Sequence, residues 1–401
     1  MTQQDFISAL VSQCRFIVFI SICAVASAQQ PTATEPRAQS FPTVASHSLR
    51  DTVQLLSQRG VSLHSTFVHD LSKSPFNAHG DNSWFARYSF DLSMDLDGPK
   101  AMHWNGSSFH LDLKRHAILA GQLYEDVAEG YSNIDADSRI CLYEAWVLQT
   151  IAQDRLEVQV GLIDANNTFA KLATGADFLN SSMGYDPTIM GFPTYPEPKP
   201  GIEASVNLPG SYRISGGGFQ TGAGRMALVE ADKKWTMKYD GAVGDVEVGY
   251  WKLREPVTMR DGEQVSSTHG YYAVVEQSIW SSENSRNGIS DRKLTSFLQV
   301  GIGAYRENSF RSHLGYGLVF QSPFSRRPAD SIGVAATRVR SAGDPDDSVA
   351  AKSEFVSEGY YKLALKNSVA LLVDTQHFVN PGAGAHSAPF FVLTPRVVFT
   401  F

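Results

Sequence analysis

The feature that most constrains this chain is a long alternation of apolar and polar residues with a period of two. In WFARYSFDLSM, apolar residues hold one face from Trp84 to Met94, while Arg87 and Asp91 lie among the polar residues of the other face. Side chains of a β-strand point to alternate faces, so this is a strand with one apolar and one polar side. An apolar face of about ten residues flanked by aromatics matches a tilted membrane strand. A soluble β-sandwich strand alternates in the same way.

The same alternation recurs to the end of the chain. It is found in RLEVQVGLID, KWTMKYD, SFLQVGIGAY, HLGYGLVFQ, YYKLALK and the terminal FFVLTPRVVFTF, and turn signals such as MRDGEQ, ENSRNG and AGDPDD lie between these segments. Strand-like segments from Val61 to Phe401 number roughly sixteen, an even number typical of outer-membrane barrels. Two segments, ICLYEAWVLQT and YYAVVEQSIW, resist assignment of faces, since Glu144 turns inward only if Trp146 is buried with it.

Bulk properties narrow the class of protein. The formal net charge of -7 argues against a binder of nucleic acid or of anionic surfaces. No stretch beyond the N-terminus offers about 18 consecutive apolar residues, which excludes a helical membrane protein. Because every backbone N–H and C=O must be paired within the protein in hydrocarbon, membrane residence requires a closed barrel.

The N-terminus predicts export. Arg15 precedes the apolar run FIVFISICAVASA, so we expect residues 1–28 to be a signal peptide cleaved after Ala28, and an anchoring helix would need a longer run. Removal leaves Cys141 as the one cysteine of the mature chain, which fits a bacterial envelope protein. Residues 29–48 are expected to form a flexible leader, and residues 49–401 a barrel domain that begins with a short helix ended by Gly60.

Motifs for catalysis or cofactor binding are absent from the sequence. There is no GxSxG elbow and no HExxH pair, and the histidines show no metal-ligand spacing. Gly216–Gly218 lie beside a strand and lack the lysine of a phosphate loop, which favours a bulge or a close backbone approach. We therefore expect no enzyme activity, no cofactor and no metal, while Asp164 and Glu276 remain possible glycosidase acids.

Several motifs are similar to one known family. The stretches VGLIDANNTFA (160–170), FLNSSMGYDPTI with FPTYPEPKPG (178–201), DLDGPKAMHWNGSSFHL (95–111), RICLYEAWVLQ (139–149) and TQHFVNPGAGA (375–385) resemble the carbohydrate-selective porins of Gram-negative bacteria, the OprB type. The lead-in SHSLRDTVQLLSQRGV departs from the family, because it lacks the family's glycines and tryptophan. The resemblance implies a sixteen-stranded outer-membrane barrel whose lumen admits sugars passively. It also implies that Phe401 is the terminal aromatic recognised by the barrel-assembly machinery.

The candidate pore-lining residues are the charged and polar side chains expected to face the lumen. Such groups replace the hydrogen bonds of a solute to water, and the planar fork of arginine offers several donors to sugar hydroxyls. The alternative is a structural ladder in which these residues pair across strands. The Pro-rich segment 186–201 either folds into the mouth or forms an external lid. The candidates are Arg87, Asp91, Arg155, Glu157, Gln159, Lys238, Glu276, Lys362, Lys366 and Arg396.

Three functions compete at this stage. The first is a sugar-permeable outer-membrane porin, the second a general or ion-selective pore, and the third a secreted β-rich carbohydrate enzyme or binding module. The expected partners are mono- or oligosaccharides, outer-membrane lipid, the barrel-assembly machinery and further copies of the chain, with no nucleic acid. The preferred sugar, the ion selectivity and the oligomeric state stay open.

Overall fold

The computed structural model describes residues 49–74, 84–120, 127–237, 242–258, 264–282, 292–304, 310–341, 353–366, 368–383 and 388–401. The expected signal peptide and leader lie outside these residues. The chain comprises two compact units, Met1–Arg59 and Gly60–Phe401. In the first unit, α2 (Leu49–Gln58) forms over the segment expected to be helical. None of the helices in the described ranges has the length and apolar character needed to cross a bilayer.

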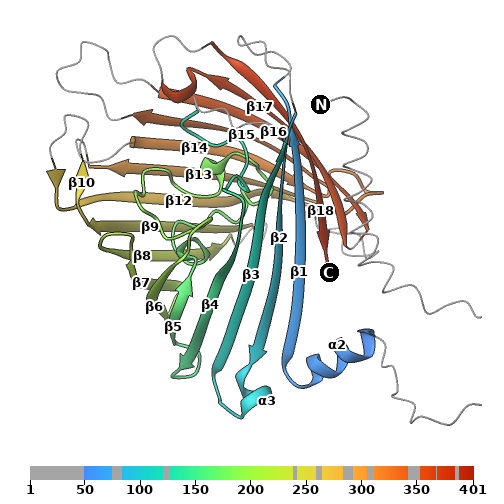
Figure 1. Ribbon diagram of the computed structural model, residues 1–401, viewed down its shortest axis with the longest axis vertical. Coiled ribbons are helices and arrows are strands. Elements are labelled where there is room, and N and C mark those ends of the chain that lie inside the picture. Colours follow the sequence, from blue (N-terminus) through green and yellow to red (C-terminus); the bar gives the residue numbers. More distant parts are fainter. Residues whose placement is uncertain are drawn as a thin grey trace, which may run out of the picture. The chain divides into compact units, whose positions relative to one another are not determined.

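The second unit is a closed barrel of sixteen antiparallel strands (Figure 1). Strand neighbours follow chain order, and β10–β11 form a separate hairpin between β9 and β12. This confirms the expected fold. The barrel strands are β1 (Val61–Ser72), β2 (Phe85–Asp97), β3 (Ser107–Ala120), β4 (Arg139–Ile151), β5 (Leu156–Ile163), β6 (Lys199–Leu208), β7 (Tyr212–Gln220), β8 (Arg225–Thr236), β9 (Val243–Arg254), β12 (Thr268–Ser281), β13 (Lys293–Gly303), β14 (Phe310–Gln321), β15 (Ser331–Ser341), β16 (Ser353–Lys366), β17 (Val369–Val379) and β18 (Phe390–Thr400).

Short elements connect the strands. The hairpin consists of β10 (Val257–Thr258) and β11 (Gln264–Val265), and the connections also include α3 (Gly98–Met102), η1 (Ala165–Asn167), η2 (Ser181–Met183) and η4 (Pro381–Ala383). Connections at the end where β1 begins and β18 ends are mostly short, while those at the opposite end include the longest, between β5 and β6.

The barrel is closed by the pairing of its first and last strands. Strand β1 pairs with β18 from Thr66 opposite Thr400 to Asp70 opposite Arg396. The seam continues into the last residue, because the Phe401 amide donates to the Ser65 carbonyl over 2.9 Å and the Ser65 amide donates back over 3.0 Å. Closure removes the unpaired strand edges that hydrocarbon does not tolerate. The terminal strand therefore completes the wall.

Alternation along the strands separates a lipid face from a lumen face. On β18, the side chains of Phe391 and Leu393 are 43% and 38% exposed on the outside, whereas Thr394 and Arg396 are 0% and 7% exposed on the inside. The register carries the same phase around the whole barrel. As a result, every acidic residue in the described barrel strands occupies an inward position: Asp70, Asp91, Asp95, Asp97, Asp112, Glu144, Glu157, Glu203, Glu230, Asp232, Asp245, Glu247, Glu276, Glu354, Glu358 and Asp374.

The two strands that resisted assignment have identifiable reasons. In β4, the register shifts between Asp112 and Leu113 of the partner strand, and buried Tyr143 and Glu144 are both left on the inside. Glu144 then accepts from the Trp146 indole over 3.2 Å, and Trp146 also faces inward but is only partly buried. A β-bulge of this kind changes the phase of a strand.

Charge on the lipid face should be poorly tolerated. Val158 on β5 faces outward, and the next residue, Gln159, faces inward opposite Glu203 of β6. We expect Val158→Lys to destabilise the folded barrel, because the ammonium group must leave water on the lipid face, where a lysine costs about 2–4 kcal/mol at mid-bilayer and less towards the rims. Gln159→Lys should fold normally, because its ammonium faces carboxylates. Heat-modifiable electrophoretic mobility and urea unfolding in lipid vesicles measure the difference, and equal folded yields would contradict these face assignments.

Candidate functional site

Two connecting segments lie inside the barrel, and we call them the insert (residues 164–198, between β5 and β6) and the short segment (residues 127–138, between β3 and β4). The insert buries Phe169, Phe178, Leu179 and Met183, each at most 1% exposed. These side chains pack against inward residues that range from β7 to β17. A single segment can contact so much of a closed wall only from within the lumen (Figure 1).

The position of the insert settles the choice between an internal constriction and an external lid. The Pro-rich part expected to do one or the other belongs to the insert, and its Ile189, Pro193 and Thr194 are buried. The inward alternative holds, and the constricting segment begins earlier than expected, at Asp164. The apolar inner wall beneath it includes Tyr272 and Val274 of β12. That explains why YYAVVEQSIW gave no clear inside and outside.

The insert is anchored to the wall through its backbone amides. Glu358 of β16 accepts from the amides of Leu179 and Asn180, and Glu230 of β8 accepts from the Ala170 amide over 2.8 Å. Buried backbone amides need partners, and hydrogen bonds to a carboxylate are among the stronger ones. These wall carboxylates therefore fix where the insert crosses the lumen.

Four other wall glutamates also accept hydrogen bonds from the insert or the short segment. Glu276, a predicted pore-lining residue, accepts from the Thr174 amide. Glu144 accepts from the Asp164 amide over 3.0 Å, and Glu203 accepts from the Thr168 hydroxyl over 2.7 Å. Glu354 accepts from the amides of Ala128 and Glu129 in the short segment, each over 2.8 Å. The structure thus gives Glu276 an anchoring contact.

The two arginines expected to meet solute lie in a buried ion network. Arg396 donates to both carboxylate oxygens of Asp70 over 2.6 and 2.8 Å, and to Asn133 of the short segment over 2.8 Å. Arg87 pairs with Asp135 of the short segment and lies 3.8 Å from Asp70. Arg87 is 2% exposed. Both side chains face inward as expected, but the structure corrects their role, because the short segment covers them and their charges are paired with Asp70 and Asp135.

Burial also perturbs acids of the short segment. Burial raises the pKa of Asp135 to about 6, and the neighbouring Arg87 opposes the shift. Burial raises the pKa of Glu129 to about 7, with His313 opposing the shift and Glu354 adding to it. Around neutral pH, the interior therefore contains a carboxyl group poised to change its charge.

Three predicted residues remain partly accessible from the lumen, each in an ion pair. Asp91 pairs with Lys114 over 3.1 Å, and Glu157 pairs with Arg213 over 2.9 Å. Lys362 of β16 donates to Asp177 on the insert over 2.5 Å, and these two side chains are 32% and 29% exposed. The last pair joins the wall to the accessible edge of the insert.

The remaining predicted residues are placed differently. Gln159 faces inward next to Glu203. Arg155 corrects an expectation, because it lies exposed in the turn after β4 rather than on the inner wall. Lys238 and the side chain of Lys366 lie outside the described residues. Phe401 is 68% exposed and its ring stacks on that of Phe399 at 6.4 Å.

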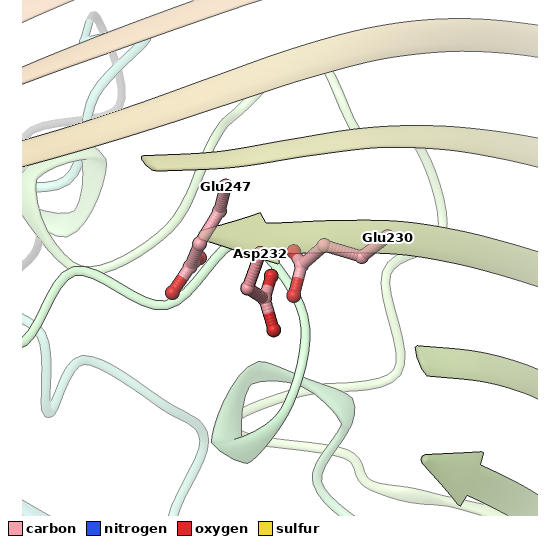
Figure 2. A group of neighbouring side chains, drawn as sticks. All are labelled: Glu230, Asp232 and Glu247. Carbon is pink, nitrogen blue, oxygen red and sulfur yellow. The ribbon is translucent and has the colours of Figure 1, made fainter. Parts of the chain in front are cut away.

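A cluster of three acidic side chains on the inner wall could hold a cation. Glu230 and Asp232 of β8 and Glu247 of β9 each place an oxygen within 4.8 Å of the others (Figure 2). Asp232 lies directly opposite Glu247 in the sheet, where like charges repel. Oxygen ligands of this kind suit a hard divalent ion such as Ca²⁺. Spacing along the sequence did not indicate this group, because it forms only when β8 pairs with β9.

Comparison with known proteins identifies the family. The family model described as carbohydrate-selective porin, OprB family, matches residues 85–255 and 238–401. The chain belongs to this family. It is an outer-membrane β-barrel of the porin class, which confirms the expected location and class of protein.

Individual relatives of this porin-family chain support the same fold. Porin B of Pseudomonas aeruginosa is 28% identical over 182 residues, which cover 45% of this chain and 34% of Porin B. The high-pH structure of Pseudomonas putida OprB has a TM-score of 0.78 at 17% identity, and the alignment covers 87% of this chain and 96% of that one. The low-pH structure of the same protein has a TM-score of 0.57 at 18% identity, over 89% of this chain and 98% of that one.

Removing an anchor should loosen the insert without opening the barrel. Glu358→Ala leaves the buried amides of Leu179 and Asn180 without an acceptor, at a cost of about 1–3 kcal/mol for each. We expect a folded barrel whose single-channel conductance is larger and noisier. Glu157→Ala is the matched control, because Glu157 pairs with Arg213 and holds no part of the insert. A quiet channel of unchanged conductance in Glu358→Ala would contradict the anchoring role.

The raised pKa of Glu129 predicts a pH-dependent stability. Because the folded state holds this proton more tightly than the unfolded state, the contribution of Glu129 to stability is complete below its ordinary pKa of 4.5 and is lost as pH rises through about 7. The loss amounts to about 3 kcal/mol. Relative to wild type, Glu129→Gln should therefore gain stability between pH 4 and pH 8. Urea unfolding in lipid vesicles at both pH values measures this, and parallel pH profiles would contradict it.

Proposed function

We propose that this protein is a passive channel for small sugars across the outer membrane. The observation that carries the proposal is the internal insert, which narrows a closed barrel of the OprB family and presents a polar edge to the remaining lumen. Lys171 on this edge is exposed, and the half-exposed Asp177 lies beside Lys362 of the wall. Such a channel breaks no bonds.

The polar edge explains how a sugar could pass. A sugar hydroxyl can both donate and accept a hydrogen bond, so paired ammonium and carboxylate groups can replace its bound water one bond at a time. Lys362 offers donors and Asp177 offers acceptors at one height of the lumen. We assign the first contact with sugar to this pair in place of the buried Arg87 and Arg396.

The charge of the lumen favours cations over anions. Asp232 and Glu247 have no ion-pair partner among the described residues, while Lys234 lies 3.6 Å from Asp245. We therefore propose a weak cation preference for salt alongside sugar permeation. Phe401 remains our candidate for recognition during barrel assembly, because it is exposed at the end of the closing strand.

The test is single-channel conductance of the refolded full-length protein in a planar bilayer, with increasing glucose or a short oligosaccharide. We expect stepwise channels that sugar blocks in a saturable way. Lys362→Met should weaken the block about tenfold, because one charged hydrogen-bond donor is lost. Lys233→Met is the matched control, since this lysine faces outward with its ammonium 4.0 Å from the Tyr212 ring centroid.

The outcomes separate the candidate functions. Channels that ignore sugar would leave a general pore. A folded protein that forms no channels would contradict the channel itself. Lys362→Met channels blocked as strongly as wild type would exclude Lys362 from the sugar path and leave the function standing.

A further inference from the structure

The outer wall carries a groove that sugar passage does not use. It spans β6 to β9, has a volume of about 710 Å³, and is lined on the outside by residues such as Ile202, Ala227 and Tyr250. Ligand sites typically have volumes of about 300–1,000 Å³. The groove lies on the face opposite the lumen, because its outward residues alternate with the buried, inward-facing Phe219 and Met226.

Small residues create the groove. Gly218 of β7 pairs with Ala227 of β8, and the two occupy adjacent outward positions. A Cβ added at Gly218 would meet nothing within 4 Å. The wall is therefore hollow here because large side chains are missing, and the strand backbone forms the floor of the groove.

Three cations line the outer part of the groove. Arg225 and Arg254 lie directly opposite each other at the ends of β8 and β9, and Lys252 lies opposite Ala227. None of the three has an ion-pair partner among the described residues. The neighbouring acid, Glu255, instead accepts from the Thr221 hydroxyl. The cations are therefore free to bind an anion.

The cations lie at headgroup level. One outward row closer to the middle of the barrel, Tyr250 and Tyr271 face lipid with ring centroids 5.1 Å apart, as in the aromatic girdle of a membrane barrel. The groove opens at the barrel end opposite the one where β1 begins and β18 ends. The longest connection, between β5 and β6, lies at the same end as the groove opening. In outer-membrane barrels, this end faces the cell exterior.

We infer that this groove binds a phosphorylated, acylated lipid of the outer leaflet. The phosphate lies between Arg225, Lys252 and Arg254, and an acyl chain lies along Gly218 and Ala227. Arginine forks and a lysine ammonium are suited to phosphate oxygens, and the apolar floor removes chain surface from the bilayer. A headgroup with two phosphates satisfies three cations better than a headgroup with one.

Charge argues against a second copy of the chain as the occupant. In the described barrel strands, every acid faces the lumen, so the lipid face of another copy offers no carboxylate to these cations. Two such faces would bring cations together. An anionic lipid supplies the complementary charge.

The test is native mass spectrometry of the folded full-length protein in detergent, titrated with diphosphoryl lipid A, monophosphoryl lipid A and phosphatidylglycerol. We expect the strongest binding for the diphosphoryl form. The triple variant Arg225→Gln, Lys252→Gln, Arg254→Gln should bind it about a hundredfold more weakly, at roughly fivefold for each cation lost. Lys233→Gln, an outward lysine at the other end of β8, should bind like wild type.

A second variant tests the floor independently of charge. Gly218→Leu adds a side chain whose Cβ has open space and should weaken lipid binding about tenfold by filling the groove, whereas Gly216→Leu, one outward row further along β7 and outside the groove lining, should not. Sugar block in a bilayer should stay at wild-type level in all of these variants, so failure here is distinct from failure of the channel proposal. Wild-type lipid affinity in both the triple variant and Gly218→Leu would overturn the site. So would an oligomer that dissociates in the triple variant without any bound lipid.

Discussion

Pairing of the backbone is the constraint on which the rest of this structure depends. In hydrocarbon an unpaired amide or carbonyl costs several kcal/mol, so a sheet can cross a bilayer only if it closes. Here β18 closes the barrel by pairing with β1, and this pairing extends to the hydrogen bonds between Phe401 and Ser65. The Arg396–Asp70 ion pair lies across the same seam on the lumen side. The residues up to Phe401 are therefore part of the wall, because their backbone groups pair with those of β1.

Closure also divides the charges of the chain. Acids placed at inward positions are spared contact with lipid, but they then face a crowded lumen in which they need partners. Backbone amides of the insert supply many of these partners, as at Glu230 and Glu358. One set of hydrogen bonds thus satisfies both the wall carboxylates and a long connection that would otherwise bury unpaired amides. Cations are not confined in the same way, and the outward Arg225 and Arg254 lie where headgroups can meet them.

Sequence periodicity was most informative where one face of a strand is apolar and the other is polar. On β18, outward Phe391 and Leu393 alternate with inward Thr394 and Arg396, so the faces could be read directly. It failed on β12, because the insert covers an inner wall that is itself apolar at Val274. It was equivocal on β4, where a bulge turns Tyr143 and Glu144 to the same side. For the site, periodicity gave the inward direction of Arg87 and Arg396 but not their burial, because their partners Asp135 and Asn133 come from a distant connection.

The sequence by itself determined the closed antiparallel barrel, the inward phase of its clean strands and its family, because these depend on local alternation and motifs that extend over most of the chain. Tertiary structure alone decided which carboxylates anchor the insert. It also decided that Lys362 and Asp177 form an accessible pair and that Asp232 meets Glu247 across two strands. The physical reason is that these relations join residues far apart in the chain. Their distances are set by closure and by the path of the insert, and neither leaves a repeating pattern in the sequence.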